Sequence, residues 1–150
     1  MSERTNDGAS VHVTIPESEV AQLADASRAH KPGELGALAC KLYDENPNLT
    51  EEEAYEAFIG WVESRGIELW PHQEEALMSI MVGDHVILGT PTGSGKSLVA
   101  LGMHFIAMCF GERSYYTAPI KALVSEKFFN LVDILGRENV GMITGDVHIN

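Results

Sequence analysis

Apolar residues recur at helical spacing through the first part of the chain. Pro16 opens one predicted helix, which ends near residue 29, and a second is predicted over 34–44. Thr50 and Glu53 have the spacing of a capping box, which predicts that a third helix begins directly after Thr50. Residues 1–66 are therefore predicted to form a small helical module.

From residue 67 the pattern changes to short apolar runs that alternate with longer amphipathic stretches. The predicted helices cover 71–81, 96–110 and 121–135, and the predicted strands cover 85–89, 114–118 and 140–144. Strands that alternate with helices are typical of an α/β fold with a parallel sheet. We therefore predict part of an α/β domain over residues 67–150, with the helical module as an N-terminal extension.

The charge of the chain is unusual for a nucleic-acid-binding protein. Lys and Arg number 10, Asp and Glu number 22, and the formal net charge is −12. Most of the acidic excess lies in the first 69 residues, and no run of basic residues occurs. A broad basic surface is thus not expected, and nucleic-acid contacts would depend on a few local groups. The acidic run 51–53 suits a solvated helix N-terminus, with docking of a protein partner as the alternative.

The two cysteines and the apolar runs indicate the cellular compartment of the protein. Cys40 and Cys109 belong to no C-x-x-C pair and lie in apolar helical contexts, so both are predicted to be buried thiols of a cytoplasmic protein. The longest apolar run, over 98–110, is shorter than the roughly 20 residues that a spanning helix needs. No signal-peptide pattern or membrane association is therefore expected.

A phosphate-binding loop is the strongest chemical signal in the sequence. It lies between a predicted strand and a predicted helix, which is the context that this motif requires. Glycines let backbone N–H groups approach phosphate oxygens, and the helix N-terminus adds partial positive charge. The alternative is a glycine-rich turn without a ligand. The candidate nucleotide-binding residues of the loop are Thr92, Gly93, Ser94, Gly95, Lys96 and Ser97.

Two residues of this loop have the more specific predicted roles. Lys96 is the candidate catalytic residue, because its ammonium would reach the β- and γ-phosphates of ATP. Ser97 is the candidate ligand of Mg²⁺ through its hydroxyl. ATP and Mg²⁺ are therefore the expected cofactors.

Three further elements carry candidate binding residues. Gln73, ahead of the P-loop, offers the donor and acceptor that adenine requires, although an isolated surface Gln would have no such role. Two segments follow predicted strands at the sheet edge where ligands of α/β folds bind. Each alone is also compatible with an ordinary turn. Their candidate nucleic-acid-binding residues are Pro119, Ile120, Lys121, Thr144, Gly145 and Asp146.

The order of these landmarks resembles that of superfamily-two helicases of the DEAD/DExH-box type. Within that group, the stretches TAPIKALVSEKF and GMITGDVHIN are most similar to the superkiller-type, exosome-associated RNA helicases. The resemblance covers about residues 67–150. It implies a RecA-like domain, Gln73 as the adenine-reading residue, Thr92 through Ser97 as motif I, and residues 119–121 and 144–146 along a single strand of RNA or DNA. Thr90, where Gly or Ala is usual, and Val124-Ser125-Glu126, where Ser-Asn-Gln is usual, depart from the pattern.

The resemblance implies an ATP-dependent helicase, and it implies that the 150 residues are the N-terminal portion of one. No Asp-Glu-x-His or Asp-Glu-Ala-Asp sequence occurs in them. Since this acidic pair holds Mg²⁺ and orients the attacking water, we predict negligible ATP hydrolysis for the 150 residues alone. The family fold also places later strands within the sheet, so we predict marginal solubility from open sheet edges and uncovered apolar faces. Two alternatives stay open at this point: a superfamily-two translocase on duplex DNA, and a catalytically incomplete nucleotide-binding remnant.

Overall fold

The computed structural model of the chain describes residues 32–91 and 95–149. The predicted helix over 16–29 lies outside these residues. In chain order the elements are α2 (Glu34–Glu45), α3 (Glu51–Ser64), α4 (Pro71–Met81), α5 (Lys96–Cys109), α6 (Lys121–Leu135), the 3₁₀ helix η1 (Arg137–Asn139), β1 (Met142–Ile143) and β2 (His148–Ile149). Every helix predicted within the described residues is confirmed, with ends that agree to within one residue.

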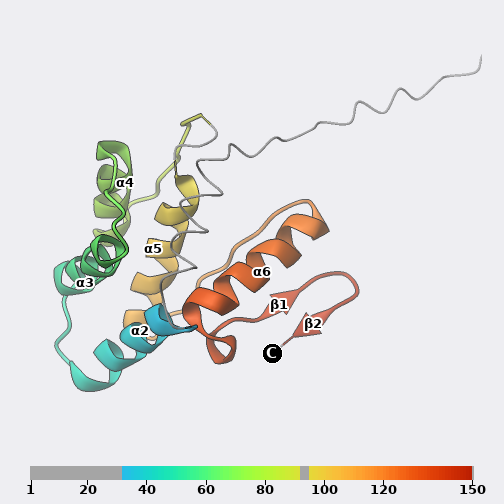
Figure 1. Cartoon of the computed structure of the whole chain (residues 1–150), viewed down its shortest axis with the longest axis horizontal. Helices are drawn as coiled ribbons and strands as arrows, with labels where there is room; N and C mark the ends of the chain where they lie inside the picture. The colour runs from blue at the N-terminus through green and yellow to red at the C-terminus, as the bar shows by residue number, and fades with distance from the viewer. Residues whose placement is uncertain (1–31, 92–94, 150) are drawn as a thin grey trace, which may run out of the picture.

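Helix α5 lies at the centre of the arrangement (Figure 1), with α3 and α4 on one side and α6 on the other. It is the most apolar of the helices, and its main contacts are with α2, α3 and α4. The rings of Phe58 from α3 and Phe105 from α5 lie 5.7 Å apart between centroids, and both side chains are fully buried. Gly102 lets α5 approach α4 closely, because a Cβ at this position would stand 2.3 Å from a methyl carbon of Leu77. The core therefore forms around α5.

Helix α2 packs against both α5 and α6. A Cβ on Gly36 of α2 would lie 1.7 Å from the carbonyl oxygen of Leu135, so this position admits glycine alone without movement of the backbone. Gly33 donates a backbone hydrogen bond of 2.7 Å to the carbonyl of Asp133. The end of α6 is thus fixed against the start of α2. The buried core of the described residues consequently includes residues from both sides of the predicted boundary at residue 67, and that boundary stays a prediction.

The predicted capping box at the start of α3 is confirmed. The Thr50 hydroxyl accepts a hydrogen bond of 3.2 Å from the Glu53 amide, and the Glu53 carboxylate accepts one of 2.9 Å from the Thr50 amide. These two bonds satisfy donors that the first turn of a helix leaves open. At the other end of α3, Arg65 forms an ion pair with Glu34 of α2 and covers the Trp61 ring at 4.9 Å.

Two of the three predicted strands do not form, and the third is shorter than predicted. Residues 85–89 and 114–118 carry no strand, and Ile87, predicted to be buried, is 96% exposed. The predicted strand over 140–144 is reduced to β1, which pairs antiparallel with β2 in the one two-stranded ladder among the described residues. An apolar run indicates that a segment is to be buried, whereas a strand also requires a neighbour that shares its hydrogen bonds. The parallel sheet stays a prediction.

Two other predictions concern single side chains and membrane crossing. Cys109 is buried as predicted, and its burial raises the pKa of the thiol to about 12. Cys40 is exposed, contrary to the prediction, and its Sγ lies 4.0 Å from Oδ1 of Asn139 in η1. Within residues 32–91 and 95–149, no helix is long and apolar enough to cross a bilayer.

Candidate nucleotide and nucleic-acid site

Gln73 connects the start of α4 to the end of the P-loop. Its side chain is fully buried, unlike that of an ordinary surface glutamine. Its Oε1 accepts a hydrogen bond of 2.9 Å from the Trp70 amide, and its Nε2 donates one of 3.0 Å to the Gly95 carbonyl. The amide of this candidate adenine reader is therefore held against the loop that would bind the phosphates.

The P-loop leads directly into α5. Its residues Thr92, Gly93 and Ser94 lie outside the described part of the chain. Gly95 takes the left-handed conformation (φ 71°, ψ 28°) as the N-cap of α5, a conformation that glycine adopts at little cost. Lys96 is the first residue of the helix, so the candidate phosphate ligand stands where the helix dipole favours an anion.

The Lys96 ammonium is turned back onto the loop that precedes it. Its Nζ donates hydrogen bonds of 2.5 Å to the Thr90 carbonyl and 3.2 Å to the Pro91 carbonyl. These neutral oxygens satisfy the ammonium in the absence of phosphate. Charged phosphate oxygens are stronger acceptors, so the lysine can exchange its partners when a nucleotide binds.

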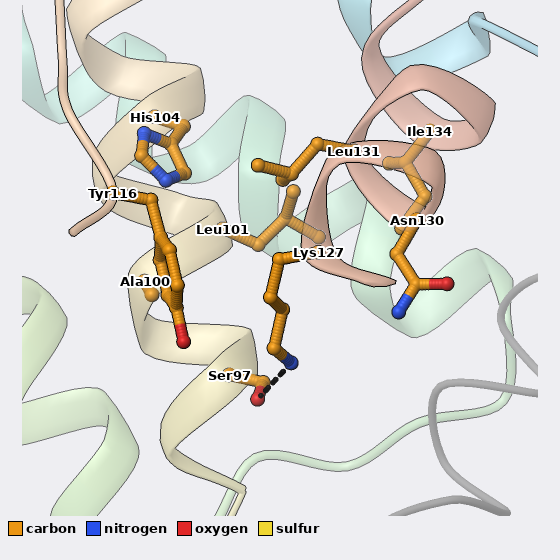
Figure 2. Close-up of a pocket in the computed structure, with 9 residues that line it drawn as sticks. All are labelled: Ser97, Ala100, Leu101, His104, Tyr116, Lys127, Asn130, Leu131 and Ile134. Carbon is orange, nitrogen blue, oxygen red and sulfur yellow. Dashed lines mark hydrogen bonds between the residues drawn. The ribbon is translucent and has the colours of Figure 1, made fainter. Parts of the chain in front are cut away.

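Ser97 lies one residue further along α5, where it faces α6. Its Oγ accepts a hydrogen bond of 3.0 Å from the Nζ of Lys127 (Figure 2). A hydroxyl oxygen is a type of ligand that a hard cation such as Mg²⁺ accepts. The candidate Mg²⁺ ligand is thus chemically appropriate. The sequence analysis did not predict Lys127, since no local pattern marks it and 30 positions separate it from Ser97.

A cavity of about 30 Å³ opens between α5 and α6 beside this contact. Figure 2 shows its lining, which comes from both helices and from the segment that precedes α6. The volume is close to that of one water molecule, so the cavity is too small for a nucleotide. The lining residues are Ser97, Ala100, Leu101, His104, Tyr116, Lys127, Asn130, Leu131 and Ile134.

His104 is the buried ionisable group of this cavity. It is 5% exposed, and its Nδ1 lies 2.7 Å from the Ser114 hydroxyl, while its Nε2 has no hydrogen-bond partner in the described residues. Burial lowers the pKa of its imidazole, because the charged form loses hydration. The sequence carried a signal for this residue: Ser97 and His104 are seven positions apart, which places both on one face of a helix.

The second group of predicted residues meets at the start of α6. Lys121 forms an ion pair with Asp146, which joins the first residue of α6 to the turn between β1 and β2. Pro119 and Ile120 are exposed beside it. The structure therefore brings the two predicted nucleic-acid motifs together.

The turn that holds Asp146 is closed by Thr144. The Thr144 amide donates to the Val147 carbonyl at 2.8 Å, and the Val147 amide donates to the Thr144 hydroxyl at 3.1 Å. The surroundings of Gly145 are open, since a Cβ there would have no neighbour within 4 Å. The turn therefore presents exposed backbone at its tip.

Comparison with known proteins gives one family and several relatives. The profile of the DEAD/DEAH box helicase family matches residues 70–148. A chloroplastic DExH-box ATP-dependent RNA helicase of Arabidopsis thaliana, DExH15, is 38% identical over 78 residues, which are 52% of this chain and 7% of the relative. The antiviral helicase SKI2 of Saccharomyces cerevisiae is 40% identical over 85 residues, which are 55% of this chain and 6% of the relative.

A DNA helicase is also among the relatives. The ATP-dependent DNA helicase Hel308 of Pyrococcus horikoshii is 41% identical over 90 residues, which are 57% of this chain and 12% of the relative. The chain thus covers a small part of the length of each of these proteins. No solved structure matches it.

The family match extends from the Trp70 that precedes Gln73 to the start of β2, and it includes both groups of site residues. The family implies a RecA-like α/β fold for this region and the use of ATP. By this match over more than half of its length, the chain belongs to the DEAD/DEAH box helicase family.

Proposed function

We propose that the chain binds ATP with Mg²⁺ and forms the N-terminal part of an ATP-dependent helicase. The observation that carries this proposal is the meeting of Gln73, Gly95, Lys96 and Ser97 at the N-terminal end of α5. These residues come from two separate segments and supply an amide, a helix N-terminus, an ammonium and a hydroxyl at one place. That combination suits a nucleotide with its metal.

Each residue has a distinct part in the proposed binding. Lys96 leaves the carbonyls of Thr90 and Pro91 and donates to the β- and γ-phosphates. Ser97 supplies an oxygen for Mg²⁺, which when bound neutralises part of the phosphate charge. Among the described residues, the Gln73 amide uses one donor and one acceptor site in its two observed hydrogen bonds. Its remaining N–H and lone pair would pair with adenine once the side chain, which is fully buried here, becomes accessible.

A single strand of RNA or DNA is the proposed second ligand. It would lie along residues 119–121 and 144–146, where Lys121 offers a charge and the turn at Gly145 offers open backbone. Relatives named as RNA helicases and as DNA helicases both support a nucleic-acid substrate. The similarity to DExH15, which is named as an RNA helicase, favours RNA as the strand and a role in RNA processing. ATP-driven movement along the strand would belong to the complete protein, since the 150 residues carry no Asp-Glu box.

Two further parts of the proposal concern the cellular setting. We propose a cytoplasmic protein without membrane association, because its sequence carries cysteines outside any disulfide-type pattern and no long apolar run. We also propose that the acidic helices ahead of residue 67 dock a protein partner, with residues 51–53 exposed at the start of α3.

Equilibrium binding of a fluorescent ATP analogue tests the central proposal. Lys96→Ala removes the ammonium at the phosphate site, and we expect affinity to fall at least tenfold, which corresponds to about 1.4 kcal/mol. Lys41→Ala is the matched control, because Lys41 is exposed on α2 and pairs with Glu45 on the same helix. It should leave affinity unchanged. Equal affinity of the Lys96→Ala variant and the parent chain would refute ATP binding at this loop.

A further inference from the structure

The contact between Lys127 and Ser97 joins a residue without a predicted role to the candidate metal ligand. Lys127 lies on α6 and Ser97 in the first turn of α5, and the Nζ to Oγ distance is 3.0 Å. Figure 2 shows the lysine extended from α6 across the cavity mouth, with its ammonium at the serine hydroxyl. The lysine thus directs a positive charge to the place where the P-loop would hold its metal.

The charge of Lys127 is compensated less well than that of Lys41 or Lys121. Lys41 and Lys121 each form an ion pair with a carboxylate and are largely exposed. Lys127 is half-buried, and in the described residues no carboxylate forms an ion pair with it. An ammonium whose described polar partner is a hydroxyl lacks the Coulombic stabilisation that a carboxylate would give it.

We propose that Lys127 occupies the position of the metal beside Ser97 in the nucleotide-free chain and must leave when Mg²⁺ and nucleotide bind. The proposal rests on the proposed ATP site. An ammonium and a Mg²⁺ ion at the same hydroxyl oxygen would lie within a few ångströms of each other, where like charges repel strongly. The two cations therefore exclude each other. Lys127 competes with the metal and so raises the Mg²⁺ concentration needed for tight nucleotide binding.

Removal of the ammonium should therefore make metal-dependent binding easier. We expect Lys127→Met to lower the Mg²⁺ concentration at half-maximal binding of a fluorescent ATP analogue by about tenfold, or about 1.4 kcal/mol. Affinity for the same analogue in EDTA should not change. Lys41→Met is the matched control, since it removes one ammonium from an exposed position on α2.

Three outcomes would overturn the proposal. An unchanged Mg²⁺ midpoint in Lys127→Met would mean that the ammonium does not compete for Ser97. A higher midpoint would mean that Lys127 assists the metal. A loss of binding in EDTA would identify Lys127 as a phosphate ligand instead. Circular dichroism spectra of the variants establish that each comparison is made between folded chains.

A measurement without nucleotide tests the contact itself. Acylation of lysines, followed by mass spectrometry, should modify Lys127 more slowly than Lys41 in the parent chain. Ser97→Ala should increase the rate at Lys127 and leave the rate at Lys41 unchanged. Equal rates at Lys127 in the two chains would overturn the contact. If the parent chain binds no nucleotide while this contact is verified, the proposed function fails; if it binds nucleotide and the midpoint does not move, only this inference fails.

Discussion

At the scale of single residues, the ion pair between Lys121 and Asp146 sets a sharp test of the nucleic-acid proposal. Asp146 holds the lysine that would contact a phosphate, so the two residues should act in opposite directions. We expect Lys121→Ala to weaken binding of a fluorescent single-stranded oligonucleotide and to reduce its log–log salt slope by about 1. Asp146→Asn should strengthen binding about twofold to fivefold, in the range of an exposed ion pair.

Lys41→Ala again serves as the control, because its charge lies on another face, in a pair with Glu45. Titrations of RNA and DNA oligonucleotides of equal sequence would also distinguish the two substrate classes. A loss of affinity in both Lys121→Ala and Asp146→Asn would contradict the expected opposition of the two charges, and would mean that Asp146 supports binding instead of holding Lys121 back.

At the scale of elements, the contact between α2 and α6 depends on one glycine. An added Cβ at Gly36 would collide with the backbone carbonyl of Leu135 at 1.7 Å, and a backbone atom cannot move aside as a flexible side chain can. We expect Gly36→Ala to lower the free energy of unfolding by about 3 kcal/mol, the upper part of the range for overpacking a core. Urea unfolding followed by circular dichroism measures the change.

Gly60 provides the matched control within α3. It is also a helical glycine, but an added Cβ would meet nothing within 4 Å. Gly60→Ala should raise the free energy of unfolding by about 0.5–1 kcal/mol, because alanine has the higher helix propensity. If Gly36→Ala were neutral or stabilising like Gly60→Ala, α2 and α6 could not pack as closely as the structure describes.

At the scale of the whole molecule, the burial of His104 makes the free energy of unfolding depend on pH. The imidazole faces Ser114, Tyr116 and Lys127 across the cavity, and its pKa is lowered from the ordinary value of 6.5. The unfolded chain therefore binds a proton at a higher pH than the folded chain. The contribution of neutral His104 to the free energy of unfolding is fully present above pH 6.5. It decreases as the pH falls from 6.5 through the folded-state pKa.

Urea unfolding between pH 5.5 and 8 measures this dependence, in a range above the titration of ordinary carboxylates. His104→Gln should flatten the fall in stability below pH 6.5, whereas His85→Gln, at an exposed position, should leave it unchanged. An identical pH profile for the parent chain and His104→Gln would contradict the assignment.

Helices could be predicted from the sequence because their signals are local. Pro71 begins α4, Thr50 and Glu53 cap α3, and the apolar stripe of each helix lies within a few turns. Strands could not be predicted with the same success, since residues 85–89 and 114–118 have the apolar pattern but no paired neighbour among the described residues. Cys40 shows the same limit for burial: helical context alone does not say which face is covered.

For the candidate site, too, local motifs indicated the residues, but not the contacts between distant ones. The motifs marked Gln73, Lys96, Ser97, Lys121 and Asp146 by residue type and order alone. That order also carried the resemblance to the helicase family, which the family profile confirms. No motif indicated the hydrogen bond from Gln73 to the Gly95 carbonyl, or the approach of Lys127 to Ser97.

The helices and the family were thus predictable from the sequence, because spacing along one chain is sufficient to specify them, and the chemical groups of the candidate site are predictions of the same kind. The tertiary structure alone decided which distant groups meet: α2 with α6 at Gly36, Lys121 with Asp146, and Lys127 with Ser97. These contacts depend on how helices pack around α5, and packing is a property of surfaces far apart in the sequence.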